Sequence, residues 1–220
     1  MDILLRSRRK LTSNAVLHEA RQRPLVLASA STRRAHILKL AGIPFEMVPS
    51  VSEPAQSSCY LPQRLVITNA TYKATRVACR CPNRIVLAAD TVIAVDTNIL
   101  GKPADAEQAR QMLKAITGRI HWVYTGFALT ICQRHHKRIL WQEWTGTQVK
   151  LRRLSQRQIE AYVTSGEPLG KAGAWAIQGR ARSFVEWIRG SYYNVVGLPI
   201  KQVLYALQTL GWTGGQARTD

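Results

Sequence analysis

Long apolar runs are missing from this chain. No stretch of about 18 or more consecutive apolar residues occurs, so the sequence does not predict a transmembrane helix. The first 24 residues are rich in arginine but contain no continuous apolar segment, which argues against a secretory signal peptide. We therefore expect a cytoplasmic protein.

Cysteine is scarce as well. Cys59, Cys79, Cys81 and Cys132 stand at irregular spacing, and the Cys79–Cys81 pair has no second pair to complete a tetrahedral zinc site. We interpret all four as reduced thiols. With 220 residues and 46% hydrophobic content, the chain can bury one sizeable core, or a core plus a lobe, without disulfides.

Acidic residues are few compared with basic ones. The chain has 31 Lys and Arg against 13 Asp and Glu, a formal net charge of +18. Such an excess favours polyanionic partners, either nucleic acid or phosphorylated small molecules. The basic residues are spread along the chain, with no aromatic RNA-binding motif and no zinc-finger spacing. Nucleic acid is therefore a possible partner but not the favoured one.

Helical and strand patterns alternate along the chain. Apolar periodicity and turn residues predict strands near 24–29, 44–48, 83–103, 121–133 and 138–154, the third broken by a turn at "DTN". The same criteria predict helices near 31–40, 61–80, 105–118, 155–166 and 199–211, the last with Pro199 at its first helical position, N1. Helices interleaved with strands predict a mixed α/β sheet covered on both faces.

The segment that follows the first predicted strand is polar and basic. Ser29 and Ser31 end the strand and start a helix, which exposes backbone N–H groups, and Arg33 and Arg34 follow in the first turn. Cations are disfavoured at this end of a helix, and a bound anion would offset that cost. The segment thus predicts a phosphate-binding loop; the alternative is that the serines cap the helix and the arginines point into solvent.

Asp90 and Thr91 interrupt the apolar strand "LAADTVIAV". A carboxylate there is costly to bury unless it is paired, holds a metal, or lies at an exposed end. We favour a functional role over the alternative that Asp90 caps a neighbouring helix.

Three lysines and a glutamine complete the candidate residues. Lys73 lies on the helix predicted near 61–80 and Lys102 in the turn "LGKP"; each alone could be a surface lysine. Lys171 and Gln178 lie in a glycine-rich segment, where glycine permits close backbone approach around a flat ligand.

Four ordered motifs, "LASASTRRAHIL", "AADTVIAVDTNILGKP", "GRIHWVYTGFAL" and "GEPLGKAGAWAIQG…VVGLP", resemble the Maf family of nucleoside triphosphate pyrophosphatases over residues 24–211. The resemblance implies an elongated central sheet with two lobes around a cleft. It also implies hydrolysis of a nucleoside triphosphate, dTTP or UTP and some modified nucleotides, to the monophosphate and pyrophosphate. Such members are linked to removal of unwanted nucleotides and to arrest of cell division.

The resemblance implies a role for each candidate residue. Asp90 would be the general base and, with Glu53, a ligand of a divalent metal, Mg²⁺ or Mn²⁺. Phosphate binding and substrate choice would involve Ser29, Arg33, Arg34, Lys73, Thr91, Lys102, Lys171 and Gln178. The first three stand in the motif Ser-x-Ser-x-Arg-Arg, while Thr91 and Gln178 match specificity positions.

Some positions depart from the family pattern. Thr32 replaces Pro, Gly170 replaces Asp, Trp175 replaces Tyr and Arg189 replaces Glu. The alternatives are a 7-methyl-GTP pyrophosphatase, or a relative without catalysis that binds nucleic acid or regulates division. We expect a basic, mobile extension over 1–23, one pyrophosphatase domain over 24–212 and a tail over 213–220. A homodimer is a possible partner arrangement.

Overall fold

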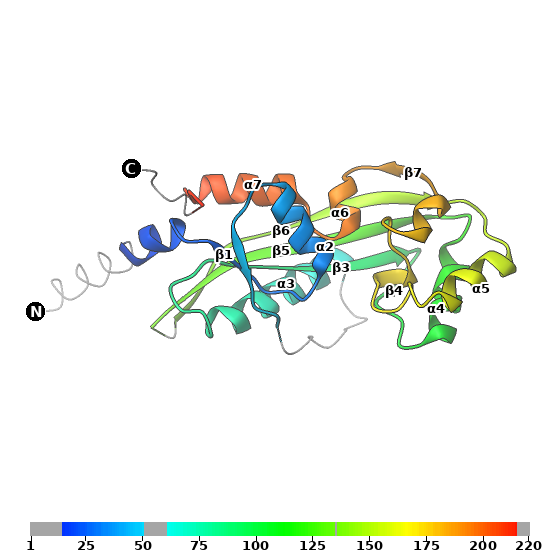
Figure 1. The fold of residues 1–220 in the computed structure, drawn as a ribbon, viewed down its shortest axis with the longest axis horizontal. Helices are drawn as coiled ribbons and strands as arrows, with labels where there is room; N and C mark the ends of the chain where they lie inside the picture. Colours follow the sequence, from blue (N-terminus) through cyan, green and yellow to red (C-terminus); the bar gives the residue numbers. More distant parts are fainter. Residues whose placement is uncertain (1–14, 51–60, 135, 215–220) are drawn as a thin grey trace, which may run out of the picture.

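A computed structural model describes residues 15–50, 61–134 and 136–214 (Figure 1). The strands are β1 (Leu25–Leu27), β2 (Phe45–Met47), β3 (Val86–Val95), β4 (Asn98–Leu100), β5 (Ile120–Gln133), β6 (His136–Leu151) and β7 (Val185–Arg189). The helices are α2 (Thr32–Leu40), α3 (Pro62–Ala78), α4 (Ala106–Ile116), α5 (Gln156–Thr164), α6 (Tyr192–Val196) and α7 (Ile200–Thr209). Two 3₁₀ segments, η1 (Ala172–Ala174) and η2 (Arg180–Phe184), lie between α5 and β7.

The strands form one seven-stranded sheet in the order β2-β1-β3-β5-β6-β7, with β4 paired to β3. β1 is parallel to β2 and β3, whereas β3, β5, β6 and β7 follow one another in antiparallel pairs. The long β5–β6 hairpin runs through most of the molecule, so the sheet is elongated (Figure 1). The predicted mixed, elongated α/β sheet is confirmed.

Strand β3 has two different neighbours on one edge. β1 pairs with its beginning at Val86 and Leu87, and β4 pairs with its end at residues 93–95. Among the described strands, none pairs with residues 88–92 on this edge, although β5 pairs with β3 from Val86 to Ala94 on the other. The gap separates a lobe with β1, β2 and α2 from a lobe with β4, α4 and α5 (Figure 1). Asp90 and Thr91 lie in the middle of this gap.

The two faces of the sheet have separate cores. Side chains alternate along β3, so Leu87 and Ala89 belong to the large apolar cluster on the side of α2 and α7. Val86 and Ala88 belong to a smaller cluster with residues of α3 on the other side. By the same alternation Asp90 faces α3, and Thr91 faces α2 and α6.

Most of the expected helix starts are confirmed. Ser31, Asp105 and Ser155 accept hydrogen bonds from the backbone as N-caps of α2, α4 and α5. The position of Pro199 was predicted wrongly by one residue: it is the N-cap of α7, with ψ 79°, and the helix begins at Ile200. β7, α6 and both 3₁₀ segments were not predicted, because the glycines of this region hide any apolar periodicity.

The described part of the N-terminal extension, from residue 15 on, is packed against the domain; residues 1–14 lie outside the described residues. Residues 15–21 are helical, and Ala20 is 1% exposed within the large cluster. The Thr213 amide donates a hydrogen bond to the Arg21 carbonyl. The described cysteines, Cys79, Cys81 and Cys132, form no disulfide, and no helix in the described ranges is long and apolar enough to cross a membrane.

Candidate active site

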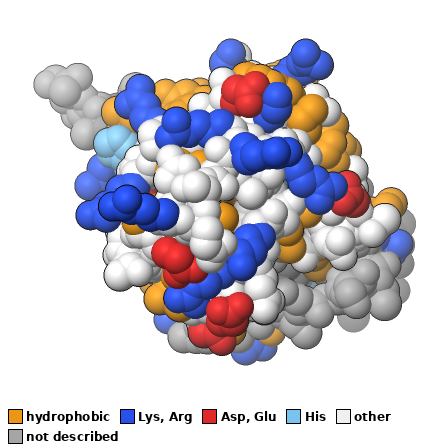
Figure 2. Space-filling view, turned by 90° about the vertical axis from the view of Figure 1, so that its right-hand side faces the viewer, with side chains coloured by type: hydrophobic (Ala, Val, Ile, Leu, Met, Phe, Trp, Pro, Cys, Tyr) orange, Lys and Arg blue, Asp and Glu red, His pale blue; other side chains and the backbone are white. Residues whose placement is uncertain are grey.

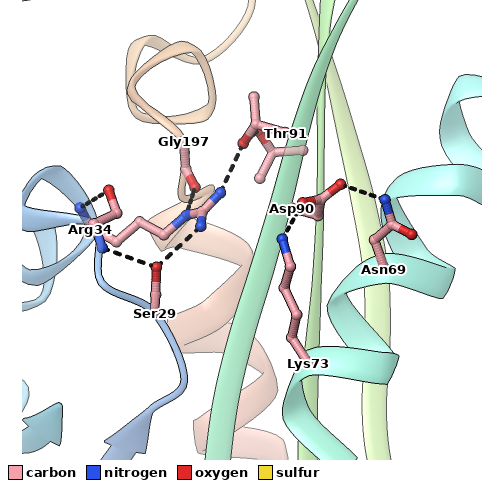
Figure 3. Close-up of polar contacts among 9 residues, drawn as sticks. Ser29, Arg34, Asn69, Lys73, Asp90, Thr91 and Gly197 are labelled. Carbon is pink, nitrogen blue, oxygen red and sulfur yellow. Dashed lines mark hydrogen bonds and ion pairs between the residues drawn. The ribbon is translucent and has the colours of Figure 1, made fainter. Parts of the chain in front are cut away.

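Asp90 is held from one side by helix α3. Its Oδ1 lies 2.6 Å from Lys73 Nζ, and its Oδ2 accepts a hydrogen bond of 2.9 Å from Asn69 Nδ2 (Figure 3). Asn69 and Lys73 are four residues apart, so they lie on the same face of α3, and both are buried. The carboxylate is therefore fixed in orientation by one charged and one neutral donor.

Gly126 allows α3 to come this close. It pairs with Asp90 across the β3–β5 ladder. A Cβ at Gly126 would lie 2.6 Å from the Val66 carbonyl carbon and 2.7 Å from the Ile67 nitrogen, both in the backbone of α3. Any other residue would push the helix away from the sheet, so the contacts to Asp90 depend on this glycine.

Arg34 connects three segments on the opposite face. Its guanidinium donates to Ser29 Oγ at 3.2 Å, to Thr91 Oγ1 at 3.2 Å and to the Gly197 carbonyl at 2.8 Å (Figure 3). These partners lie after β1, in β3 and after α6. Arg34 therefore connects the loop that precedes α2 to the sheet and to the segment between α6 and α7.

Arg33 and Lys171 bring positive charge from the two lobes. Burial lowers the pKa of Arg33, and the nearby Tyr162 phenol opposes that shift. The pKa of Lys171 is lowered by burial and then by the charge of Arg33, with Glu167 acting in the opposite direction. Because the two cations repel each other across the lobes, an anion bound between them would be favoured.

Glu167 fixes the ends of the loop that carries Lys171 and Gln178. Its Oε1 accepts a hydrogen bond from the Tyr162 hydroxyl at 3.1 Å, and its Oε2 accepts from the Arg180 amide at 3.2 Å. Lys171 Nζ donates to the Glu167 carbonyl. Burial, followed by the charge of Glu167, raises the pKa of Tyr162, so this phenol stays a donor.

A cavity of about 370 Å³ opens at the gap in the sheet. Its lining contains most of the predicted residues: Ser29, Arg33, Arg34, Lys73, Asp90, Thr91, Lys102 and Gln178. Lys171 stands beside the cavity but is not part of its lining, and Glu53 lies outside the described residues. The eight lining candidates thus belong to one cleft, although they come from five separate segments of the chain.

Three of the unusual positions can now be located. Gly170 lines the cavity with φ 73°, and a side chain there would meet nothing within 4 Å. Trp175 lines it too but is only 4% exposed, and its ring stands edge-on to His121 at 5.4 Å between centroids. Arg189 is not among the lining residues; its guanidinium lies over Trp187 at 5.5 Å.

Several residues that build the site were missed from the sequence. Asn69 and Gly126 position Asp90, and Tyr162 and Glu167 support the loop. An asparagine one turn before Lys73 in the apolar stripe of a helix was an available signal for Asn69. Nothing in the sequence around Gly126 distinguishes it from a glycine in any strand.

The described residues around Asp90 can be tested for a metal site. No group of three or more His, Cys, Asp or Glu side chains suited to a metal occurs among them. Asp90 is the one carboxylate among the described residues that line the cavity. Mg²⁺ is commonly held by one or two carboxylates together with substrate phosphates and water, so this donor set fits a metal that binds with a phosphorylated ligand.

A carboxylate fixed at the gap of a mixed sheet and surrounded by Lys, Arg and Ser side chains defines an α/β protein with a cleft for an anionic, phosphate-bearing ligand. A family model described as Maf-like protein matches residues 24–210. The chain belongs to the Maf family.

Curated relatives agree with this assignment. The chain is 41% identical over 186 residues to proteins named dTTP/UTP pyrophosphatase from Bacillus cereus strain AH820 and from Bacillus anthracis, covering 84% of this chain and 95% of each relative. A similar protein of Bacillus mycoides strain KBAB4 has the same name and identity. Among solved structures, a HAM1 protein from Coxiella burnetii aligns over 84% of this chain and 98% of its own, with 17% identity and a TM-score of 0.44.

Proposed function

We propose that this protein hydrolyses dTTP and UTP, and some modified nucleotides, to the monophosphate and pyrophosphate. The observation that carries the proposal is the Asp90 carboxylate, held by Lys73 and Asn69 inside a cleft lined by further cationic side chains. The names of the relatives support the same substrates. Removal of unwanted nucleotides from the cytoplasmic pool, with an effect on cell division, would be its role.

The reaction follows from the placement of these groups. Asp90 orients a water molecule and accepts its proton as the water oxygen bonds to the α-phosphorus. The bond from that phosphorus to the bridging oxygen breaks, and pyrophosphate leaves. Arg33 and Lys102, which line the cleft, stabilise the charge that accumulates on the leaving group. Ser29 donates from its hydroxyl, and Lys171 adds charge from beside the cavity.

A divalent metal, Mg²⁺ or Mn²⁺, is part of the proposal. Asp90 would hold it together with the substrate phosphates and with Glu53, which the resemblance matches to a metal-site residue. Such an ion would draw charge from the phosphate oxygens.

The base preference rests on Gln178 and Trp175. A glutamine amide offers a donor and an acceptor, which complement the O4 and N3–H groups of uracil and thymine. A positively charged 7-methylguanine would be better bound by an open aromatic face. Trp175 offers little such surface, because it is 4% exposed and packed edge-on against His121. This supports UTP and dTTP over the alternative of 7-methyl-GTP.

Pyrophosphate release with UTP, dTTP and 7-methyl-GTP, each with and without Mg²⁺ or Mn²⁺, tests the proposal. We expect metal-dependent release with UTP and dTTP, at least about tenfold faster in kcat/KM than with 7-methyl-GTP, a gap of about 1.4 kcal/mol. Equal rates on both classes would overturn the base preference. If no nucleotide releases pyrophosphate, the proposed activity is wrong. The alternative of a family member without catalysis, which binds nucleic acid or regulates division, would then be favoured. Analytical ultracentrifugation of the same sample tests for a homodimer.

A further inference from the structure

Exposed arginines gather at the end of the molecule that carries α5 and η2. We define the arginine end as Arg152, Arg153, Arg157, Arg180 and Arg182, all of which are exposed. Figure 2 views the molecule from this end: blue Lys and Arg side chains form several patches spread over the face, and red Asp and Glu side chains are fewer and lie beside some of them. The residues lie between 152 and 182 in sequence, but three separate segments contribute them.

Backbone hydrogen bonds bring these segments together. The Arg152 amide donates to the Phe184 carbonyl at 2.9 Å, which joins the end of β6 to η2. The Gly118 amide donates to the Arg152 carbonyl at 3.3 Å, and a Cβ at Gly118 would lie 3.5 Å from Arg153 Cβ. Arg157 follows in the first turn of α5. The positions of these arginines are therefore set by the fold, not by a flexible tail.

Several acidic side chains near this end pair with other basic residues, although Glu167 Oε2 accepts a hydrogen bond from the Arg180 amide. Asp96 pairs with Arg119, Glu186 with Lys150, and Glu160 with Arg110. In the described part of the chain, no ion pair includes a residue of the arginine end. The first turn of α5 contains Arg157 and no acidic residue, although a cation is disfavoured there. An external anion would relieve this repulsion.

We propose that the arginine end binds nucleic acid through its phosphate backbone. Guanidinium groups bind phosphate with two parallel hydrogen bonds, and several of them on one face match the repeated charge of a nucleic acid. None of these arginines lines the catalytic cavity, so the two sites are separate. Because the contacts are to phosphate, binding has no sequence preference. Part of the net charge of +18 would then serve to bind the phosphates of nucleic acid.

The experiment measures binding of the full chain to a labelled DNA duplex and to an RNA duplex of the same sequence by fluorescence anisotropy. If the five arginines contact about four or five phosphates, the logarithm of the binding constant falls with the logarithm of salt concentration with a slope of about −4. The triple substitution Arg152→Glu, Arg153→Glu and Arg157→Glu should weaken binding at least tenfold and bring the slope closer to zero. An acidic side chain is favoured in the first turn of a helix, so glutamate at position 157 stabilises the start of α5 and the variant retains its fold.

A matched control separates this surface from general charge. The triple substitution Arg76→Glu, Lys137→Glu and Lys201→Glu changes exposed residues on other elements by the same total charge. It should weaken binding less than threefold, and a chain that lacks residues 1–14 should still bind. UTP hydrolysis by both triple variants should equal that of the parent, although the binding result does not depend on that activity.

Three results would overturn the proposal: equal loss of binding in both triple variants, loss of binding on removal of residues 1–14 alone, or no binding at about 50 mM salt, where phosphate contacts are strong. Tighter binding to phosphatidylserine vesicles than to either duplex would assign the surface to a membrane instead. A difference between the DNA and RNA duplexes would identify which nucleic acid is bound.

Discussion

The two faces of the sheet differ at the point where Asp90 and Thr91 meet the cleft. On the α3 face, both oxygens of the Asp90 carboxylate have partners, Lys73 and Asn69. On the other face, both ring nitrogens of His121 and Nε1 of Trp175 are buried without a hydrogen-bond partner among the described residues. The fold itself thus positions the Asp90 carboxylate, whereas His121 and Trp175 have no such partners among the described residues. Gln63 Oε1 in α3 and Thr130 Oγ1 in β5 are also buried without a partner, so the contrast concerns these particular groups rather than whole faces.

This difference suggests that the two faces of the sheet have different roles in the reaction. The α3 face holds the group that we assign to catalysis, and the opposite face forms the wall near Gln178 that we assign to nucleotide choice. A reacting group needs a fixed position, because catalysis is sensitive to small displacements. Each prediction below tests one side of this contrast, beginning with the largest effect.

Asp90→Asn tests the reacting group itself. We expect kcat for UTP to fall about a hundredfold or more with KM nearly unchanged, because the amide cannot accept a proton from water. Steady-state pyrophosphate release measures both constants. A variant with unchanged turnover would remove Asp90 from the reaction.

His121 tests the unsatisfied face through pH. Burial lowers the pKa of His121 to about 4, so its neutral form is favoured in the folded state. Between about pH 6.5 and 4 the unfolded chain binds a proton that the folded chain does not, and stability is lost as pH falls through this window, by about 2 to 3 kcal/mol. Urea unfolding at pH 7 and pH 4.5 measures the loss.

The control for that experiment is an exposed histidine. His121→Leu should reduce the difference in unfolding free energy between the two pH values by about 2 kcal/mol. His36→Leu, on the exposed side of α2, should leave the difference unchanged. If both substitutions act alike, the unsatisfied His121 is not the source of the acid sensitivity.

Asn69→Leu tests whether the α3 face acts through Asp90. Loss of the amide donor should lower kcat about tenfold, with KM and melting temperature close to those of the parent. The same substitution made in the Asp90→Asn protein should change kcat less than twofold, because the group that Asn69 positions is already lost. An equal loss in both backgrounds would make Asn69 a structural residue only.

Arg34→Lys and Arg33→Lys compare the paired arginines. Lysine cannot reproduce the three contacts of Arg34, so Arg34→Lys should lower the free energy of unfolding by about 1 to 2 kcal/mol. Arg33→Lys should leave stability nearly unchanged and raise KM. Thermal unfolding measures the stability of each variant, and steady-state kinetics with UTP measures its KM. Equal stabilities of the two variants would contradict the assigned roles.

Gln178→Ala should have the smallest effect. We expect the preference for UTP over 7-methyl-GTP to shrink from about tenfold to about threefold, since one hydrogen-bonding side chain contributes only part of the discrimination. Gln111→Ala, on the exposed surface of α4, is the control. A preserved preference in Gln178→Ala would place recognition of the base elsewhere in the wall.

The sequence predicted the parts of the site whose chemistry is local. Asp90 in an apolar strand and two arginines at the start of a helix are unusual within their own segments, so each could be recognised without a structure. The gap between β1 and β4 could not be predicted, because it depends on which strands pair along β3. The separate roles of Arg33 and Arg34 also depend on distant partners, above all Gly197. Glu53 lies outside the described residues, and its role stays a prediction.

Among the described strands, the gap also leaves a short length of the β3 edge without a β partner. The Ala28 amide donates to the Leu87 carbonyl, so the peptide groups of Leu87 point toward the β1 edge of β3. Peptide groups two residues apart point to the same edge of a strand, so those of Ala89 and Thr91 point to this edge as well. An unpaired edge on a surface can template pairing with another chain and start aggregation. Here β1 and β4 occupy the positions before and after it, so an incoming strand has no room to align. Among the described strands, this stretch of β3 thus keeps peptide donors and acceptors available to a small molecule while its neighbours leave little length of edge for a second strand.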